Sequence, residues 1–416
     1  MGVQTKSDRI QAARVRLDTP AGRGFLLIAG ATAAFGFAMA AQQNIVSNYF
    51  ENELGLAGPE FGYITAIREI PGFLLIFLTA LFYRLSLPHL TALALLLLAV
   101  GYGFFGVSDS FWTVTPWVII SSMGYHTFLQ TQAALGMSLT TEKRSGGILG
   151  RLNAINQGGA LVAMTVVLVA FHYEWLDFRE TFVICGIFAL IAAILISRFP
   201  NLHNGELQER AVKRDRIVMR RDYRFYYLLS LLDGARQQIF FSFGLWVLVD
   251  HFDLGVPAIS AIMLVTAAMA MFAGPWIGRQ IDHHGERSML GIVNVAYIVA
   301  LLGYALIDNV GIAIVCYVIY SFIFPLSAMG ASVYLRKIAP ARDIAPSLAM
   351  GLTMQHAAAV VVPVVTGFVL NYVGYQIPFL VASVFAAITV LVTRRLDPAN
   401  QKSSQRLQEE AASASV

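Results

Sequence analysis

Charged side chains and cysteines are scarce in this sequence. Of its 416 residues 13% are charged and 57% hydrophobic, and its two cysteines, Cys185 and Cys316, both lie inside apolar stretches. Average soluble domains carry about 25% charged residues, so this composition excludes an ordinary soluble fold. Two isolated cysteines indicate neither a disulfide framework nor a thiolate metal site. The few charges inside apolar stretches therefore require a specific explanation.

Enzyme motifs are also missing. The sequence has no phosphate-cradling glycine loop, no nucleophile–base pattern and no metal-ligand spacing, and the adjacent His283 and His284 are a weak metal signal. We therefore expect no enzymatic activity, no cofactor and no bound metal. The pI near 9.0 does not indicate nucleic-acid binding, because the basic residues are scattered over many loops.

Long hydrophobic stretches, by contrast, are abundant. A bilayer-spanning helix needs about 20 apolar residues, and twelve stretches meet that length. The predicted spans are 24–47, 60–83, 88–107, 111–138, 147–171, 179–198, 224–249, 257–278, 288–307, 311–335, 345–370 and 375–395. The fold class predicted from them is an all-α membrane protein with twelve transmembrane helices.

The basic residues predict the orientation of these helices. All but three of the 29 lysines and arginines lie in the two tails, in the loops that follow the second, fourth, sixth, eighth and tenth predicted spans, or at the borders of these segments. An excess of basic residues marks the cytoplasmic side, so both termini are expected in the cytoplasm of a multi-pass protein of the cytoplasmic membrane. The exceptions are Arg179, in an otherwise acidic loop, and Arg68 and Arg236, which lie inside predicted spans.

The two halves of the chain resemble each other. Gln42 and Gln43 recur as Gln237 and Gln238 in the first helix of the second half. The predicted organisation is a cytoplasmic tail (1–23), a six-helix half (24–198), a cytoplasmic linker (199–223), a second six-helix half (224–395) and a disordered tail (396–416). Polar residues concentrate in some helices of each half, so we expect two pseudo-symmetric halves around a central cavity.

One loop carries a recognisable motif. Residues 278–287 read Gly-Arg-Gln-Ile-Asp-His-His-Gly-Glu-Arg. This resembles the G-x-x-x-D-x-x-G-x-R/K loop of the major facilitator superfamily at Gly278, Asp282, Gly285 and Arg287. The resemblance implies that Asp282 closes the cytoplasmic gate by pairing with Arg336 or Arg287. The equivalent loop of the first half lacks the motif, so we expect an asymmetric gate.

The predicted span 224–249 holds the most unusual polar group. Asp233, Arg236 and Gln237 are spaced i, i+3 and i+4, which places them on one helical face near the middle of the membrane. A guanidinium is always charged and suits carboxylates and phosphates. Arg236 therefore either anchors a substrate, with Asp233 as counter-ion or proton carrier, or forms a structural pair with Asp233.

The predicted span 60–83 contains a second pair of charges, Arg68 and Glu69. Adjacent helical residues point about 100° apart, so each is expected to have its own partner. Burial raises the pKa of a carboxyl and a nearby arginine lowers it, so Glu69 could exchange a proton between conformations. A packing or gate contact between the halves is the alternative.

Further polar residues lie well inside other spans. Those that we expect to meet a substrate, besides Arg236 and Gln237, are Gln42, His126, Gln130, Gln157, Gln355 and His356. Histidine titrates near neutral pH, so His126 is either a proton relay or substrate contact, or an interior hydrogen-bonded residue.

The resemblance implies secondary active transport of a small organic solute by alternating access. The residues favour an organic anion or polar metabolite, with proton coupling through Glu69, Asp233 and Arg68. One alternative is a proton-driven efflux carrier for hydrophobic or cationic compounds; another is a transport-inactive receptor or scaffold. The expected partners are the solute, protons or another coupling ion, and membrane lipids, with the chain acting as a monomer.

Overall fold

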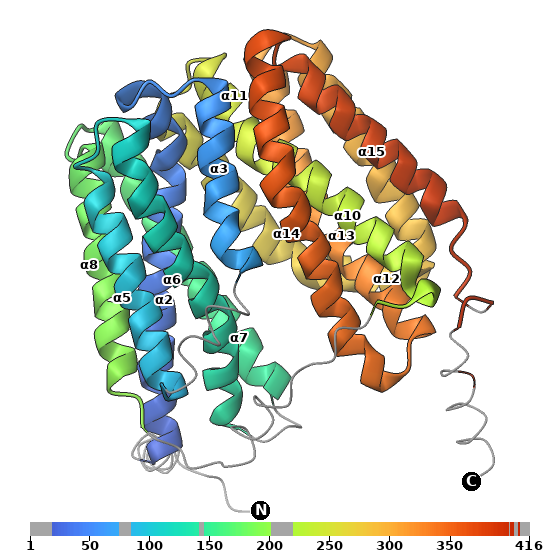
Figure 1. The fold of residues 1–416 in the computed structure, drawn as a ribbon, viewed down its shortest axis with the longest axis horizontal. Helices are drawn as coiled ribbons and strands as arrows, with labels where there is room; N and C mark the ends of the chain where they lie inside the picture. The colour runs from blue at the N-terminus through green and yellow to red at the C-terminus, as the bar shows by residue number, and fades with distance from the viewer. Residues whose placement is uncertain are drawn as a thin grey trace, which may run out of the picture. The chain divides into compact units, whose positions relative to one another are not determined.

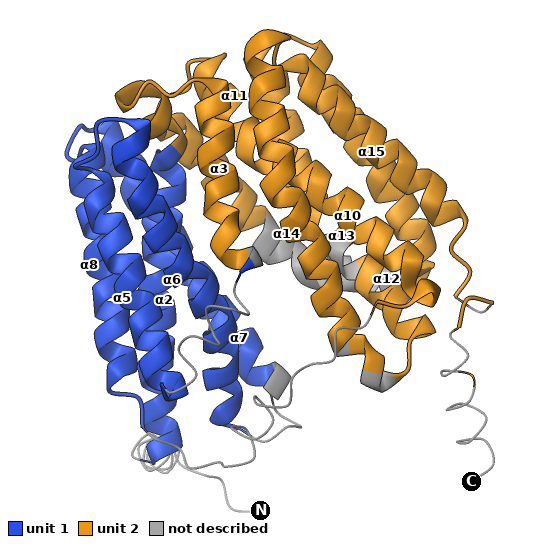
Figure 2. Ribbon diagram, viewed as in Figure 1, with its two compact units in different colours: residues 1–46, 74–214 blue, residues 47–73, 215–416 orange. Residues whose placement is uncertain are grey.

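The structure, a computed structural model, describes residues 19–74, 85–140, 145–200, 219–398, 400–402 and 407. Every regular element within these residues is a helix (Figure 1). They form two compact units, which Figure 2 colours separately: unit 1 comprises residues 1–46 and 74–214, and unit 2 comprises residues 47–73 and 215–416.

Unit 1 is a bundle of long apolar helices. Its elements are α2 (Pro20–Asn48, as far as residue 46), α5 (Leu87–Phe105), α6 (Phe111–Ser138), α7 (Ser145–His172) and α8 (Phe178–Ser197). Helix α8 begins at a capping box, in which the backbone N–H of Glu180 donates to Asp177 Oδ1 over 2.7 Å. A Cβ at Gly101 would lie 2.5 Å from Ser121 Cβ, so glycine allows α5 to approach α6.

Unit 2 contains the remaining elements. They are η1 (Tyr49–Glu53), α3 (Gly58–Phe73), η3 (Arg221–Tyr223), α10 (Arg224–Gln238), η4 (Ile239–Phe243), α11 (Gly244–Asp250), α12 (Val256–Leu306), α13 (Val310–Ile338), α14 (Ala341–Tyr372) and α15 (Gln376–Arg394). Helix α12 breaks at Gly285, whose φ of 74° is in the left-handed region that glycine tolerates. The predicted helices on either side of this glycine are therefore both present.

The helices follow the predicted spans to within a few residues where their ends are described. Sequence reasoning missed two π-helical turns, η1 and η4, because a π-turn does not interrupt the apolar pattern. The predicted end of the second span and most of the linker and C-terminal tail fall outside the described residues.

Helix α3 belongs to unit 2 because it packs closely on α14. A Cβ at Gly62 would lie 2.5 Å from the carbonyl oxygen of Pro363, and one at Gly58 would lie 2.9 Å from that of Gly367. Small residues let helix backbones approach in this way. The compact units thus differ from the predicted halves in residues 47–73.

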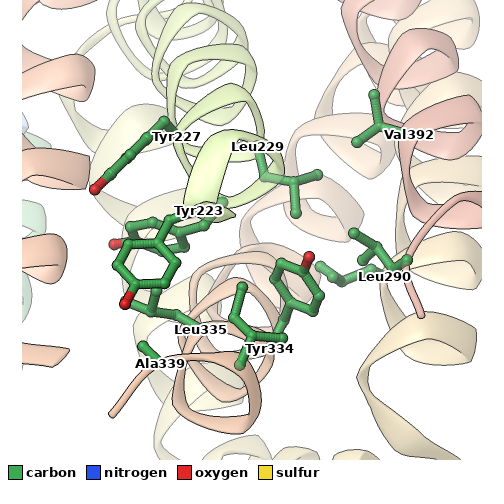
Figure 3. Close-up of a cluster of buried hydrophobic side chains, with 11 residues drawn as sticks. Tyr223, Tyr227, Leu229, Leu290, Tyr334, Leu335, Ala339 and Val392 are labelled. Atoms are coloured by element: carbon green, nitrogen blue, oxygen red, sulfur yellow. The ribbon is translucent and has the colours of Figure 1, made fainter. Parts of the chain in front are cut away.

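One end of unit 2 is rich in basic residues and is called the basic end below. It is marked by Arg220, Arg224, Arg336, Lys337 and Arg394. Buried tyrosines and aliphatic side chains of η3, α10, α12, α13 and α15, including Tyr223, Tyr334 and Val392, pack together there (Figure 3). Arg220 Nε lies 2.9 Å from Asp343 Oδ2, which ties the end of the linker to the start of α14.

The composition of the helices suits a membrane. Seven helices of the described chain are long and apolar enough to cross a bilayer, and Val256–Met269 and Val310–Phe324 are shorter apolar segments. Large apolar side chains such as Val299, Val365 and Leu391 are more than half exposed. Such positions would contact lipid, so the described helices are those of a polytopic membrane protein.

Candidate functional site

Unit 2 buries an ion pair within a single helix. Arg236 is 1% exposed, and its Nη2 donates to Oδ1 of Asp233, one turn earlier in α10. Ser327 of α13 donates to the same carboxylate oxygen over 2.7 Å. The i, i+3 spacing predicted this contact between Asp233 and Arg236, whereas Ser327 was not anticipated.

Two tyrosines complete the surroundings of Arg236. Its guanidinium carbon lies 3.6 Å from the centre of the Tyr297 ring and 5.5 Å from that of Tyr320. Aromatic faces attract a guanidinium, and more so when water is excluded. Sequence reasoning missed both tyrosines, although Tyr320 and Ser327 are seven residues apart and so share one face of α13.

A cavity of about 190 Å³ lies beside this pair, inside unit 2. Residues of α10, α12, α13, α14 and α15 line it. Its polar lining consists of Tyr226, Ser230, Asp233, Ser327, Gln355 and Thr389, together with Ser332. The predicted residues Asp233 and Gln355 therefore meet at one cavity.

A second charged cluster joins α3 to α14. Glu69 is 8% exposed, and its Oε2 lies 3.4 Å from Nδ1 of His356. Its Oε1 lies 3.3 Å from Nη2 of Arg68, so Arg68 and Glu69 also contact each other, whereas the sequence predicted a separate partner for each. The long arginine side chain reaches back to its neighbour although the two Cα–Cβ bonds point apart.

Helix α14 connects the cavity and this second cluster. Gln355 lines the cavity, and the adjacent residue His356 faces Glu69. A Cβ at Gly234 would lie 2.8 Å from the Cα of Gln355, so α10 and α14 are in close contact at this level. The two buried carboxylates, Asp233 and Glu69, therefore lie on either side of one short segment of α14.

The other predicted substrate residues are distributed over both units. Gln42 and His126 are buried in unit 1, whereas Gln130 is exposed and Gln157 is half-buried. Gln237, in unit 2, is half-buried. Their roles remain predictions.

The predicted gate is described in part. The surroundings of Gly278 and of the Asp282 side chain lie outside what the structure describes, and so does the expected pairing of Asp282. Arg287 Nη2 donates to the backbone oxygen of Arg394 over 2.7 Å, at the end of α15. Arg336 is exposed, and Gly285 has the backbone conformation given above.

The fold and the site define a polytopic helical membrane protein with ionisable groups buried in its interior. The family model of the major facilitator superfamily matches residues 26–231 and again residues 226–415. The chain therefore belongs to the major facilitator superfamily, a family of membrane transporters built from two repeats. No curated protein matches the sequence.

Solved structures share this fold at low sequence identity. The nucleoside transporter NupG has a TM-score of 0.73 at 14% identity, covering 90% of this chain and 98% of that one. A bacterial homologue of the human lysosomal transporter Spinster has a TM-score of 0.72 at 12% identity, covering 93% and 99%. The D-xylose–proton symporter has 0.71 at 14%, covering 92% and 100%. At these identities the likeness establishes the fold alone.

Proposed function

We propose that this chain is a proton-coupled secondary transporter that moves a small polar organic solute across the cytoplasmic membrane by alternating access. The proposal rests on membership of the major facilitator superfamily and on the contact between buried Glu69 and half-buried His356. It works as a monomer surrounded by lipid, with the solute and the proton as its other partners.

Glu69 is the proposed proton carrier. A carboxylate as buried as that of Glu69 is stabilised by its basic partners, which here are Arg68 and His356. Because His356 lies on α14 and Glu69 on α3, any movement of one helix along the other changes the surroundings of the carboxylate. Loss of a basic partner favours the protonated form of a buried acid. Proton binding and helix movement are then linked.

The charge balance favours a solute without net charge. Arg236 is paired with Asp233, and Arg68 with Glu69, so an uncharged polar solute leaves both pairs intact. Two of the structural neighbours are named for such solutes, a nucleoside and D-xylose. This supports a polar metabolite as the substrate class.

An organic anion is the second candidate, and one observation favours it. Nη1 of Arg236 is buried and has no hydrogen-bond partner among the described residues. A carboxylate or phosphate group is a suitable acceptor for that nitrogen. The efflux of cations, in which Glu69 and Asp233 would hold the charge, makes the opposite prediction for Arg236→Gln: cation transport persists, whereas anion transport is lost.

Transport by Glu69→Gln in proteoliposomes tests the main proposal. A panel of nucleosides, sugars, small carboxylates and lipophilic cations first identifies a solute that exchanges across the membrane. We expect Glu69→Gln to retain solute counterflow, since exchange needs no net proton movement. Accumulation driven by a pH gradient should fall to the level of protein-free vesicles. Glu53→Gln, which changes an exposed acid of η1, is the matched control and should accumulate solute normally.

Two outcomes would contradict the proposal. If Glu69→Gln accumulates solute like the unchanged protein, Glu69 does not carry the proton. If no solute of any class exchanges, transport itself is in doubt and the receptor or scaffold alternative gains support.

A further inference from the structure

The chain stays packed against unit 2 after α15 ends. Leu396, two residues beyond the last helical residue Arg394, is fully buried. It belongs to the apolar cluster at the basic end, together with Leu290 of α12 and Tyr334 of α13, both labelled in Figure 3. An apolar side chain gains free energy by leaving water, so Leu396 holds the segment after α15 against the other helices of this end.

One glutamine closes this segment into a compact loop. Gln401 Oε1 accepts from the hydroxyl of Tyr334 over 2.8 Å and from the backbone N–H of Asp397 over 2.9 Å. Its Nε2 donates to the backbone oxygen of Arg395 over 2.8 Å. A glutamine amide has two acceptor and two donor positions, and most of them are used here. Residues 395–401, called the clip below, are thereby tied to one another and to α13.

The residue that precedes the clip binds the last residue of the loop motif at 278–287. Arg287 Nη2 donates to the backbone oxygen of Arg394 over 2.7 Å. The last carbonyl groups of a helix have no partner within the helix and carry partial negative charge, so they suit a guanidinium. Because Arg287 is exposed, water competes for its guanidinium. The position of the Arg394 carbonyl therefore decides whether this bond forms.

The position of Arg287 matters because α12 is kinked beside it. Gly285, two residues earlier, has a φ of 74°, and the two parts of α12 meet there. Leu290, three residues after Arg287, is buried in the same apolar cluster as Leu396. The second part of α12 is thus held at its start by a polar bond to the end of α15 and by apolar packing in the cluster that the clip completes.

We propose that Gln401 is a positioning residue for Arg287. By closing the clip, Gln401 keeps the Arg394 carbonyl where the guanidinium of Arg287 binds it, and so fixes the end of the loop motif against α15. This adds to the predicted gate a residue that lies more than a hundred positions away in the sequence. The inference concerns how one end of unit 2 is held, so it depends neither on the solute nor on the proton carrier.

Two variants loosen the clip to different extents. Gln401→Ala removes all the hydrogen bonds of the amide, whereas Tyr334→Phe removes the bond to α13 and keeps the ring that packs in the cluster. Tyr334→Phe therefore serves as the test if Gln401→Ala does not fold. Gln376→Ala is the matched control, because it makes the same substitution at the first residue of α15, at the other end of that helix.

Hydrogen–deuterium exchange of the purified protein in detergent, followed by peptide mass spectrometry, reports on the backbone amides of residues 286–290. We expect Gln401→Ala to speed their exchange at least about fivefold, and Tyr334→Phe by a smaller factor, because a loosened contact makes local opening easier. Gln376→Ala should exchange like the unchanged protein, and so should residues 58–73 of α3 in every variant. Unchanged exchange of residues 286–290 in both clip variants would overturn the proposal.

A double variant tests whether Gln401 acts through Arg287. Arg287→Ala removes the guanidinium and should itself speed the exchange of residues 286–290. Adding Gln401→Ala should then increase the rate no further, because the bond that Gln401 positions is already absent. Effects of the two substitutions that multiply would show that Gln401 stabilises unit 2 by another route and would refute the positioning role. These measurements need no transported solute, so a failed transport assay leaves this inference standing.

Discussion

Among the described residues, Arg236 is the charged side chain that is most completely buried. Its guanidinium contacts Asp233 on one side and the ring of Tyr297 on another, and no more than 1% of the residue is exposed. Removing one member of a buried pair leaves the other charge without compensation, and this is far more destabilising than removing both. We therefore expect the pair to stabilise unit 2, whatever further part it plays in binding.

Single and double substitutions at this pair should differ in the size of their effects. We expect Arg236→Gln and Asp233→Asn each to lower the free energy of unfolding by about 3–5 kcal/mol. The double variant, with two neutral amides, should lose much less than the sum of the two single losses. Thermal unfolding in detergent measures all three. Additive losses would mean that the two side chains do not interact in the folded protein.

At the scale of elements, the contact between α3 and α14 depends on residues without side chains. Gly58 and Gly62 face the backbone of α14 at Gly367 and Pro363, and further along the same contact Glu69 meets His356. Close backbone packing at one end thus sets the distance at which the polar pair forms. A substitution at either glycine should therefore alter the distance between the Glu69 carboxylate and His356.

Gly62→Ala tests this packing. The added methyl group would lie 2.5 Å from the carbonyl oxygen of Pro363, so the helices must separate. Overpacking of this kind typically lowers stability by about 1–3 kcal/mol. Gly158→Ala in α7 is the control, because nothing lies within 4 Å of its added Cβ. A thermal unfolding temperature of Gly62→Ala equal to that of the control would refute the close contact.

At the scale of the whole molecule, the basic residues distinguish one end of unit 2 from the other. Arg220, Arg224, Arg336, Lys337 and Arg394 mark one end of unit 2, whereas the turn between α12 and α13 contains Asp308. His251 Nε2 lies 2.9 Å from Asp308 Oδ1, so this turn is held to the end of α11. From the positive-inside rule we expect the basic end to face the cytoplasm.

Reporter fusions test this orientation. We expect alkaline phosphatase, which is active only outside the cytoplasm, to be active when fused after Asp308. The same reporter fused after Gly285, at the break in α12, should be inactive. A fluorescent protein at the C-terminus should fluoresce. The reverse pattern of phosphatase activity would overturn the predicted orientation.

Sequence alone determined the class, the helices and their order, because a bilayer imposes length and hydrophobicity on each span. The i, i+3 spacing of Asp233 and Arg236 also predicted their contact, since helical neighbours are set by local geometry. The motif around Gly285 located the break in α12, where a positive φ favours glycine.

Tertiary structure alone decided which distant groups meet. The contact of Glu69 with His356, the stacking of Arg236 on Tyr297 and the bond from Ser327 join helices far apart in sequence. Their spacing along the chain carries no signal of these contacts, because they depend on how helices pack. The cavity beside Asp233 has the same origin, since it is bounded by side chains from five helices.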